Sequence, residues 1–235
     1  MTYEPKQVEV FQNLFLRGPA KSQPALRQAL LDHVAGPWCH AEEIEKKLST
    51  LPGWSAGRPG SASGENGADI LAFDRDTSDG LPAATLWLSS QSDGYKVTNI
   101  IPSETGQLDY SEYNAILEDF GQRVASRAAQ QVGFQIETTS SRQSIEDWLP
   151  QKAAEALRRF SRYANKSTGS AHPSDREHWF KFLITAHSDK GQLDTELLAR
   201  WLVEVEGWSD DRADKLAIEY EFGLGLLSEY DHHHP

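Results

Sequence analysis

Residues 84–101 read ATLWLSSQSDGYKVTNII, and they carry the strongest strand pattern in the N-terminal part of the chain. Two runs rich in Leu, Trp, Val and Ile flank the dipeptide Asp93-Gly94, which is favoured in two-residue hairpin turns. The pattern therefore predicts two antiparallel strands, over residues 84–89 and 95–101.

Further elements extend this hairpin into a layered domain. The apolar run at residues 70–73 predicts another antiparallel strand, joined to the hairpin through Asp79-Gly80. A capping box at residues 109–112 begins a helix that reaches about residue 130, and residues 134–138 form a fourth strand. Helices are also expected over residues 22–34 and 40–50. We predict an α+β fold, with an antiparallel β-meander or small mixed sheet that carries helices on one face.

From Ser144 onward the apolar spacing is helical throughout, which predicts an all-α C-terminal subdomain. Trp179, Phe180 and Ile184 are among the apolar residues of one expected helix. Gly223 falls within the last helix, where close packing against a neighbouring helix would justify the loss of helix propensity.

Composition divides the chain into three expected regions. Residues 1–140 form the α+β domain, with a flexible Gly/Ser/Pro-rich loop at residues 52–68. Residues 141–170 carry a net charge of +3 and form a basic connecting helix with a polar linker. Residues 171–235 carry a net charge of −8 and form an acidic helical subdomain.

The overall charge and cysteine content limit the function classes. The 235 residues include 23 basic and 35 acidic side chains, for a net charge of −12, which disfavours nucleic acid as a partner. No apolar stretch approaches the ~18 residues needed to span a bilayer, and no secretory signal is apparent. Because Cys39 is the single cysteine, no intrachain disulfide can form, and we expect a cytoplasmic, bacterial-type soluble protein.

One acidic motif contains candidate catalytic carboxylates. Asp74 and Asp76 follow the apolar run at residues 70–73, and this arrangement resembles the first motif of haloacid-dehalogenase-type phosphatases. The resemblance implies a nucleophilic Asp74, an acid/base Asp76 and a Mg²⁺ ion between carboxylates and phosphate. It covers about nine residues, and the expected βα continuation is replaced here by further strands. The other interpretation is an acidic hairpin loop.

Two more clusters are candidate functional groups. Asp175 and His178 lie one helical turn apart and suit general acid–base chemistry, or else capping and packing. Arg158, Arg162 and Lys166 recur every four residues and form a basic stripe that suits an anion, or that pairs with carboxylates of the same chain. We assign no metal site and no cofactor.

The leading functional hypothesis is a non-enzymatic interaction or regulatory protein, such as an accessory subunit or an acidic antitoxin or immunity-type inhibitor. We expect another protein as its partner, and the acidic charge suits a basic one. An exposed Trp54, Trp87 or Trp208 would supply contact area. No oligomeric state is predicted.

The alternative is a metal-dependent hydrolase or phosphoesterase. It would use Asp74 with Asp76, or Asp175 with His178, while Arg158 and Arg162 hold the phosphate. A third hypothesis is a nucleic-acid-associated regulator that acts through the helix within residues 141–170.

Overall fold

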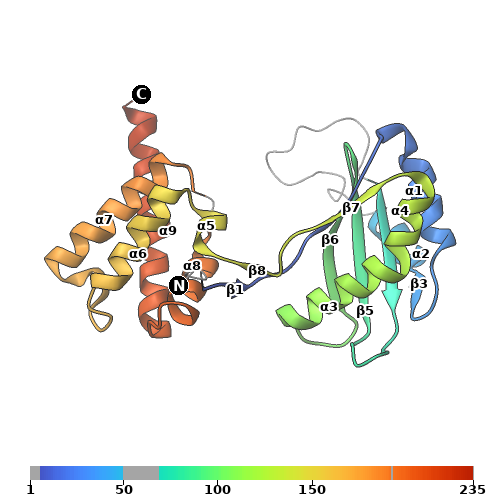
Figure 1. The fold of residues 1–235 in the computed structure, drawn as a ribbon, viewed down its shortest axis with the longest axis horizontal. Helices are drawn as coiled ribbons and strands as arrows, with labels where there is room; N and C mark the ends of the chain where they lie inside the picture. The colour runs from blue at the N-terminus through green and yellow to red at the C-terminus, as the bar shows by residue number, and fades with distance from the viewer. Residues whose placement is uncertain (1–5, 50–68, 192, 235) are drawn as a thin grey trace, which may run out of the picture. The chain divides into compact units, whose positions relative to one another are not determined.

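A computed structural model describes residues 6–49, 69–191 and 193–234. The chain divides into two units (Figure 1). The sheet unit comprises Phe11–Ser141, and the helical unit comprises Arg142–Pro235 together with Met1–Val10. The loop expected at residues 52–68 lies outside the described residues.

The sheet unit has the predicted α+β architecture (Figure 1). Its elements in chain order are β2 (Leu14–Arg17), η1 (Ala20–Ser22), α1 (Gln23–Asp32), β3 (Trp38–His40), α2 (Glu42–Ser49), β4 (Ile70–Arg75), β5 (Ala84–Gln91), β6 (Gly94–Pro102), α3 (Tyr110–Phe120), η2 (Gly121–Ala125), α4 (Ser126–Val132) and β7 (Gln135–Thr138). Six strands form one sheet in the order β3-β4-β5-β6-β2-β7, and every neighbouring pair is antiparallel. The helices at α1 and at α3–η2–α4 share one buried apolar cluster with the sheet.

The turns and caps of this unit follow local sequence chemistry, with one shift of register. Asp79 and Gly80 both adopt positive φ, as the predicted turn between β4 and β5 requires. The predicted hairpin of β5 and β6 is also present, but Gln91 pairs with Gly94, so the turn residues are Ser92 and Asp93. The predicted Asp93-Gly94 turn is therefore wrong by one residue.

The shift has a steric reason in the neighbouring strand β2, which the sequence analysis did not predict. Gly94 pairs with Arg17 of β2 and has a φ of +148°. A Cβ atom at this position would lie 1.7 Å from the carbonyl oxygen of Leu16. Only glycine allows the two backbones to approach this closely.

The helical unit contains a short two-stranded sheet and a set of packed helices. Its elements are β1 (Val8–Glu9), β8 (Arg142–Gln143), α5 (Ile145–Trp148), α6 (Gln151–Tyr163), η3 (Gly169–Ala171), α7 (Pro173–Ser188), α8 (Thr195–Glu204) and α9 (Asp210–His233). Strand β1 pairs antiparallel with β8, and Arg200 donates to the Glu9 carbonyl oxygen at 2.8 Å. Val8 and Glu9 thus belong to this unit, which was not predicted.

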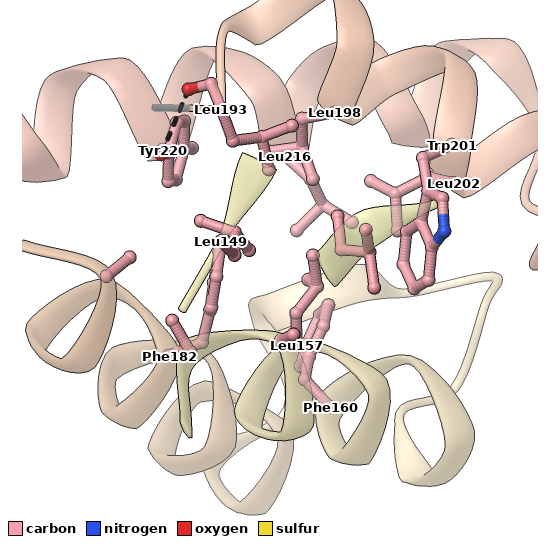
Figure 2. Close-up of a cluster of buried hydrophobic side chains, with 14 of the residues drawn as sticks. Leu149, Leu157, Phe160, Phe182, Leu193, Leu198, Trp201, Leu202, Leu216 and Tyr220 are labelled. Atoms are coloured by element: carbon pink, nitrogen blue, oxygen red, sulfur yellow. Dashed lines mark hydrogen bonds between the residues drawn. The ribbon is translucent and has the colours of Figure 1, made fainter. Parts of the chain in front are cut away.

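The core of the helical unit differs from the expected separation of residues 141–170 from residues 171–235. Phe160 on α6 packs against Trp179 on α7, with ring centroids 4.8 Å apart, and stacks with Trp208 at 5.6 Å. Figure 2 shows the core side chains of α6, α7, α8 and α9 meeting in one cluster. The polar segment after α6 folds back, because the Asp175 carboxylate accepts a hydrogen bond from the Asn165 amide at 3.1 Å. It is therefore a turn within one core.

One buried polar group of this core makes a hydrogen bond across the unit. The Tyr220 hydroxyl donates to the Leu193 carbonyl oxygen at 3.1 Å, the dashed contact in Figure 2. Burial, and to a smaller extent the Asp194 charge, raises the pKa of Tyr220 to about 12. The phenol is neutral in the folded protein well beyond the pH at which an exposed tyrosine ionises.

The steric role of Gly94 gives a first prediction. Gly94→Ala should lower the free energy of unfolding by more than about 3 kcal/mol, because backbone strain adds to the clash with Leu16. Gly80→Ala is the matched control, since Gly80 also has positive φ but a Cβ atom added there would meet no atom within 4 Å, so its cost should be about 1 kcal/mol. Urea unfolding followed by circular dichroism measures both. Equal costs would contradict the packing argument.

The Tyr220 environment gives a second prediction. Between about pH 10 and pH 12 the unfolded chain loses a phenolic proton that the folded chain retains, so the free energy of unfolding falls as pH rises. Tyr220→Phe should cost about 1 kcal/mol at neutral pH and should reduce this alkaline loss of stability. Urea unfolding of both proteins at about pH 9 and about pH 11.5 provides the comparison. An identical alkaline loss in the two proteins would show that Tyr220 is not responsible.

Candidate functional site

The predicted acidic motif, Asp74 and Asp76, lies at the end of β4, where the contacts around it organise a turn. Asp74 on β4 accepts a hydrogen bond from the Thr85 hydroxyl at 2.6 Å across the β4–β5 pair. Arg75, between the two carboxylates, is buried and donates to Asp119 and to the carbonyl oxygens of residues 76, 78, 81 and 82. Its guanidinium therefore organises the turn that follows β4. This is the acidic hairpin loop that the sequence analysis left open.

Cys39 lies on β3, directly paired with Asp74. Cys39 is exposed as a residue, but partial burial of its thiol raises the thiol pKa, and the charges of Asp74 and Asp76 raise it further. A thiol in this environment stays protonated at neutral pH and is a weak nucleophile and a weak metal ligand.

Asp175 and His178 also make contacts with neighbouring residues of the helical unit. The Asp175 carboxylate is buried and accepts from Asn165 N, and from the Ser174 hydroxyl at 3.4 Å. His178 Nδ1 lies 3.0 Å from the Ser174 carbonyl oxygen, and its ring stacks on Tyr163. These contacts are those of a capping and packing pair.

The basic stripe on α6 is largely engaged within the helical unit. Arg158 forms an ion pair with Glu146, and Lys166 donates to the Glu206 carbonyl oxygen. Arg162 is exposed. The stripe belongs to the helical unit, as do Asp175 and His178, whereas Asp74 and Asp76 belong to the sheet unit.

The sheet unit holds a polar cluster that the sequence analysis missed. Glu45 on α2 accepts from His40, Arg27 and the Ala72 amide at 2.8, 3.0 and 2.8 Å. These bonds attach α2 to α1, β3 and β4. Across the described ranges, no three His, Cys, Asp or Glu side chains are grouped as a metal site would require.

The clearest surface feature lies in the helical unit. A groove of about 710 Å³ runs between α7 and α9, with η3 along its side; we call it the α7–α9 groove. Its apolar lining comprises Trp179, Phe180, Leu183 and Ile184 from α7 and Leu216, Phe222, Leu226 and Leu227 from α9. The buried indole N–H of Trp179 has no hydrogen-bond acceptor within the described part of the chain.

Much of this apolar lining is open to solvent. Phe222 is 74% exposed, Leu226 is 61% exposed, and Phe180 and Ile184 are each slightly more than half exposed. Single exposed apolar residues are ordinary on a protein surface, but a contiguous set around a groove marks an interaction site.

Charged side chains at the groove are mostly basic. Arg176, Arg212 and Lys215 line it together with one acid, Glu219. Glu219 accepts a hydrogen bond from the Ser170 hydroxyl at 2.6 Å, and Arg176 donates to the Ala171 carbonyl oxygen at 3.0 Å. These two contacts hold η3 against α7 and α9, and so shape the side of the groove.

The close approach of the two helices explains how the groove forms. Gly223 of α9 faces Leu183 of α7, and a Cβ atom at position 223 would lie 2.8 Å from Leu183 Cδ1. The close packing that the sequence analysis offered as a reason for Gly223 is therefore present.

Known proteins offer little guidance on this unit. Residues 150–221 are similar to a family described as "Domain of unknown function (DUF1889)". The similarity covers under a third of the chain and runs from α6 into α9. No curated protein and no solved structure matches the chain. The helices in the described ranges include none with the length and apolar character of a membrane span.

The groove residues were missed at the sequence level. Phe180 and Ile184, which the sequence places among the apolar residues of their helix, are exposed. Trp208, one of three Trp side chains whose exposure would have supported the binding hypothesis, is buried and donates to Ser161 at 2.7 Å. Trp87 is half-buried and Trp54 lies outside the described residues. The available signal was a second apolar stripe on the last helix, at residues 218, 222 and 226.

If the exposed lining serves an interaction, it should contribute little to folding. Phe222→Gln should change the free energy of unfolding by no more than about 0.5 kcal/mol, because the ring is mostly in water already. Leu216→Ala, on the buried side of the same helix, should cost about 2–5 kcal/mol. Urea unfolding followed by circular dichroism distinguishes them. A comparable loss from both would mean that Phe222 belongs to the core.

Proposed function

We propose that this protein acts by binding another protein, as a non-enzymatic accessory or regulatory protein of the cytoplasm, and that the α7–α9 groove is its binding surface. The observation that carries the proposal is the exposure of Phe180, Ile184, Phe222 and Leu226 around one groove. A cytoplasmic accessory subunit or an inhibitor of the antitoxin or immunity type are both consistent with this role.

Burial of these exposed side chains in an interface is favourable in free energy. Complete burial of a Phe, Leu or Ile side chain contributes roughly 1.5–3 kcal/mol relative to full exposure. Four such side chains, each more than half exposed, therefore provide a substantial driving force once association and ordering costs are subtracted. Exposed aromatic rings such as Phe180 and Phe222 are also common anchors in protein interfaces.

The chemistry of the groove supports binding over catalysis. Its charged lining consists of three bases and Glu219, and the Glu219 carboxylate is already hydrogen-bonded to Ser170. An arginine side chain does not lose its proton in proteins and is a poor general base. Of the carboxylates that were catalytic candidates, Asp74 and Asp175 accept structural hydrogen bonds away from the groove, and Asp76 is exposed and does not line it.

Photo-crosslinking in the cells that make the protein tests this function. A benzophenone amino acid at position 222 should give a discrete protein adduct, because Phe222 lies at the groove. The matched control places the same group at Tyr163, which is 66% exposed on α6 and does not line the groove. Mass spectrometry of the adducts then identifies the bound protein.

The two positions should give different results. An adduct found from position 222 and absent from position 163 supports the proposed surface. The same pattern of adducts from both positions, or no protein adduct from position 222, would contradict it.

A further inference from the structure

We infer that the α7–α9 groove accepts an amphipathic α-helix of the partner protein, with carboxylates bordering its apolar face. This inference rests on the proposed function and names the chemistry of the partner at the same site.

The dimensions of the groove fit a helix. Its lining on α9 runs from residue 212 to residue 227, which spans about 22 Å at the rise of an α-helix. On α7 the lining from residue 176 to residue 184 spans about 12 Å. A helical segment of about 10 to 15 residues matches this length, and helix-in-groove docking uses apolar anchors at helical spacing.

The exposure of the walls favours a helix over a small apolar ligand. A small molecule seated between Leu183 and Leu216 would leave Phe222 and Leu226 in contact with water. A helix is about 10 Å across with its side chains and reaches both the inner lining and these outer side chains. It therefore removes the largest apolar area from water.

The charges of the lining set the chemistry of the bordering residues. Three of the four charged side chains are basic, although the whole chain has 12 more acidic than basic residues. In the part of the chain that the structure describes, neither Arg212 nor Lys215 takes part in an ion pair. Partner carboxylates would give both cations charge-assisted hydrogen bonds as the apolar faces meet.

The mostly basic charge of the groove is opposite in sign to the net charge of the whole chain. The net charge of −12 favours a basic partner at long range, and on that ground a basic protein was expected. Charges separated by more than about 8 Å are largely screened at physiological ionic strength, so the side chains at the groove decide the contact.

A second copy of this chain is a poorer occupant. Helix α9 carries the bases Arg212 and Lys215 and seven acidic side chains, which are Asp210, Asp211, Asp214, Glu219, Glu221, Glu229 and Asp231. Two α9 helices placed against one another would bring like charges together, which opposes association. A partner helix from a different protein avoids this repulsion.

Two synthetic peptides test the inference on the full-length protein. Both are 15-residue fluorescent helices with leucines along one face; one has glutamates and the other lysines beside that face. The net charge of the protein favours the lysine peptide, whereas the groove favours the glutamate peptide. We expect the glutamate peptide to bind about tenfold more tightly by fluorescence anisotropy.

Variants of the protein test whether the preference for the glutamate peptide depends on side chains of the groove. Arg212→Glu combined with Lys215→Glu should abolish or reverse the order of the two affinities. Lys181→Glu is the matched control, because Lys181 is exposed on α7 and does not line the groove, and it should preserve the order. Phe222→Gln should weaken both peptides by at least about tenfold.

The outcomes separate this inference from the proposed function. Lysine-peptide binding that is equal or tighter, and still lost in Phe222→Gln, would overturn the acidic helix and retain the groove as a binding surface. No binding of either peptide, or binding that Phe222→Gln leaves unchanged, would count against both. Phe222-dependent dimerisation of the protein alone, or Phe222-dependent binding to phosphatidylcholine vesicles, would overturn the inference by assigning the groove to another occupant.

Discussion

Contact between Leu183 of α7 and Gly223 of α9 is the packing constraint on which the groove depends. A single added methyl group at Gly223 would lie 2.8 Å from Leu183 Cδ1, so the absence of a side chain at position 223 gives Leu183 its place against α9. Along α9, Leu216 and Tyr220 belong to the buried core, whereas the helix continues to His233 beyond them. The side chains of α7 and α9 that lie beside this contact line the α7–α9 groove.

Much of the fold could be predicted because local chemistry determines it. Both reciprocal hydrogen bonds of the capping box at Asp109 and Glu112 are formed, and the Asp79-Gly80 turn joins antiparallel strands as expected. Strand β2 was missed because four residues carry little periodicity, although it lies between β6 and β7 in the sheet. The register of the hairpin was wrong by one residue because contact with that unseen strand decides where Gly94 lies.

The candidate site was harder to predict, because burial depends on which helices meet. Phe180 and Ile184 fit an apolar helix pattern as well as Trp179 does, and only the packing of α6, α8 and α9 leaves them outside the core. The acidic pair Asp74 and Asp76 was difficult for the opposite reason, because a candidate catalytic motif has a structural role. Its spacing permits catalysis, yet the buried Arg75 between them organises a turn. Charge was misleading for a similar reason, since the net value of the chain says little about the four charged side chains at one groove.

The central claim is that the apolar walls of the α7–α9 groove face solvent in the unbound protein. Hydroxyl-radical footprinting of the isolated protein, read by mass spectrometry, measures this exposure residue by residue. We expect rapid oxidation of Phe180 and Phe222 and slow oxidation of Phe160 and Phe182, which are fully buried in the same unit. Slow oxidation of Phe180 and Phe222, at the rate of the buried pair, would mean that the groove is covered by the chain itself and would contradict the account.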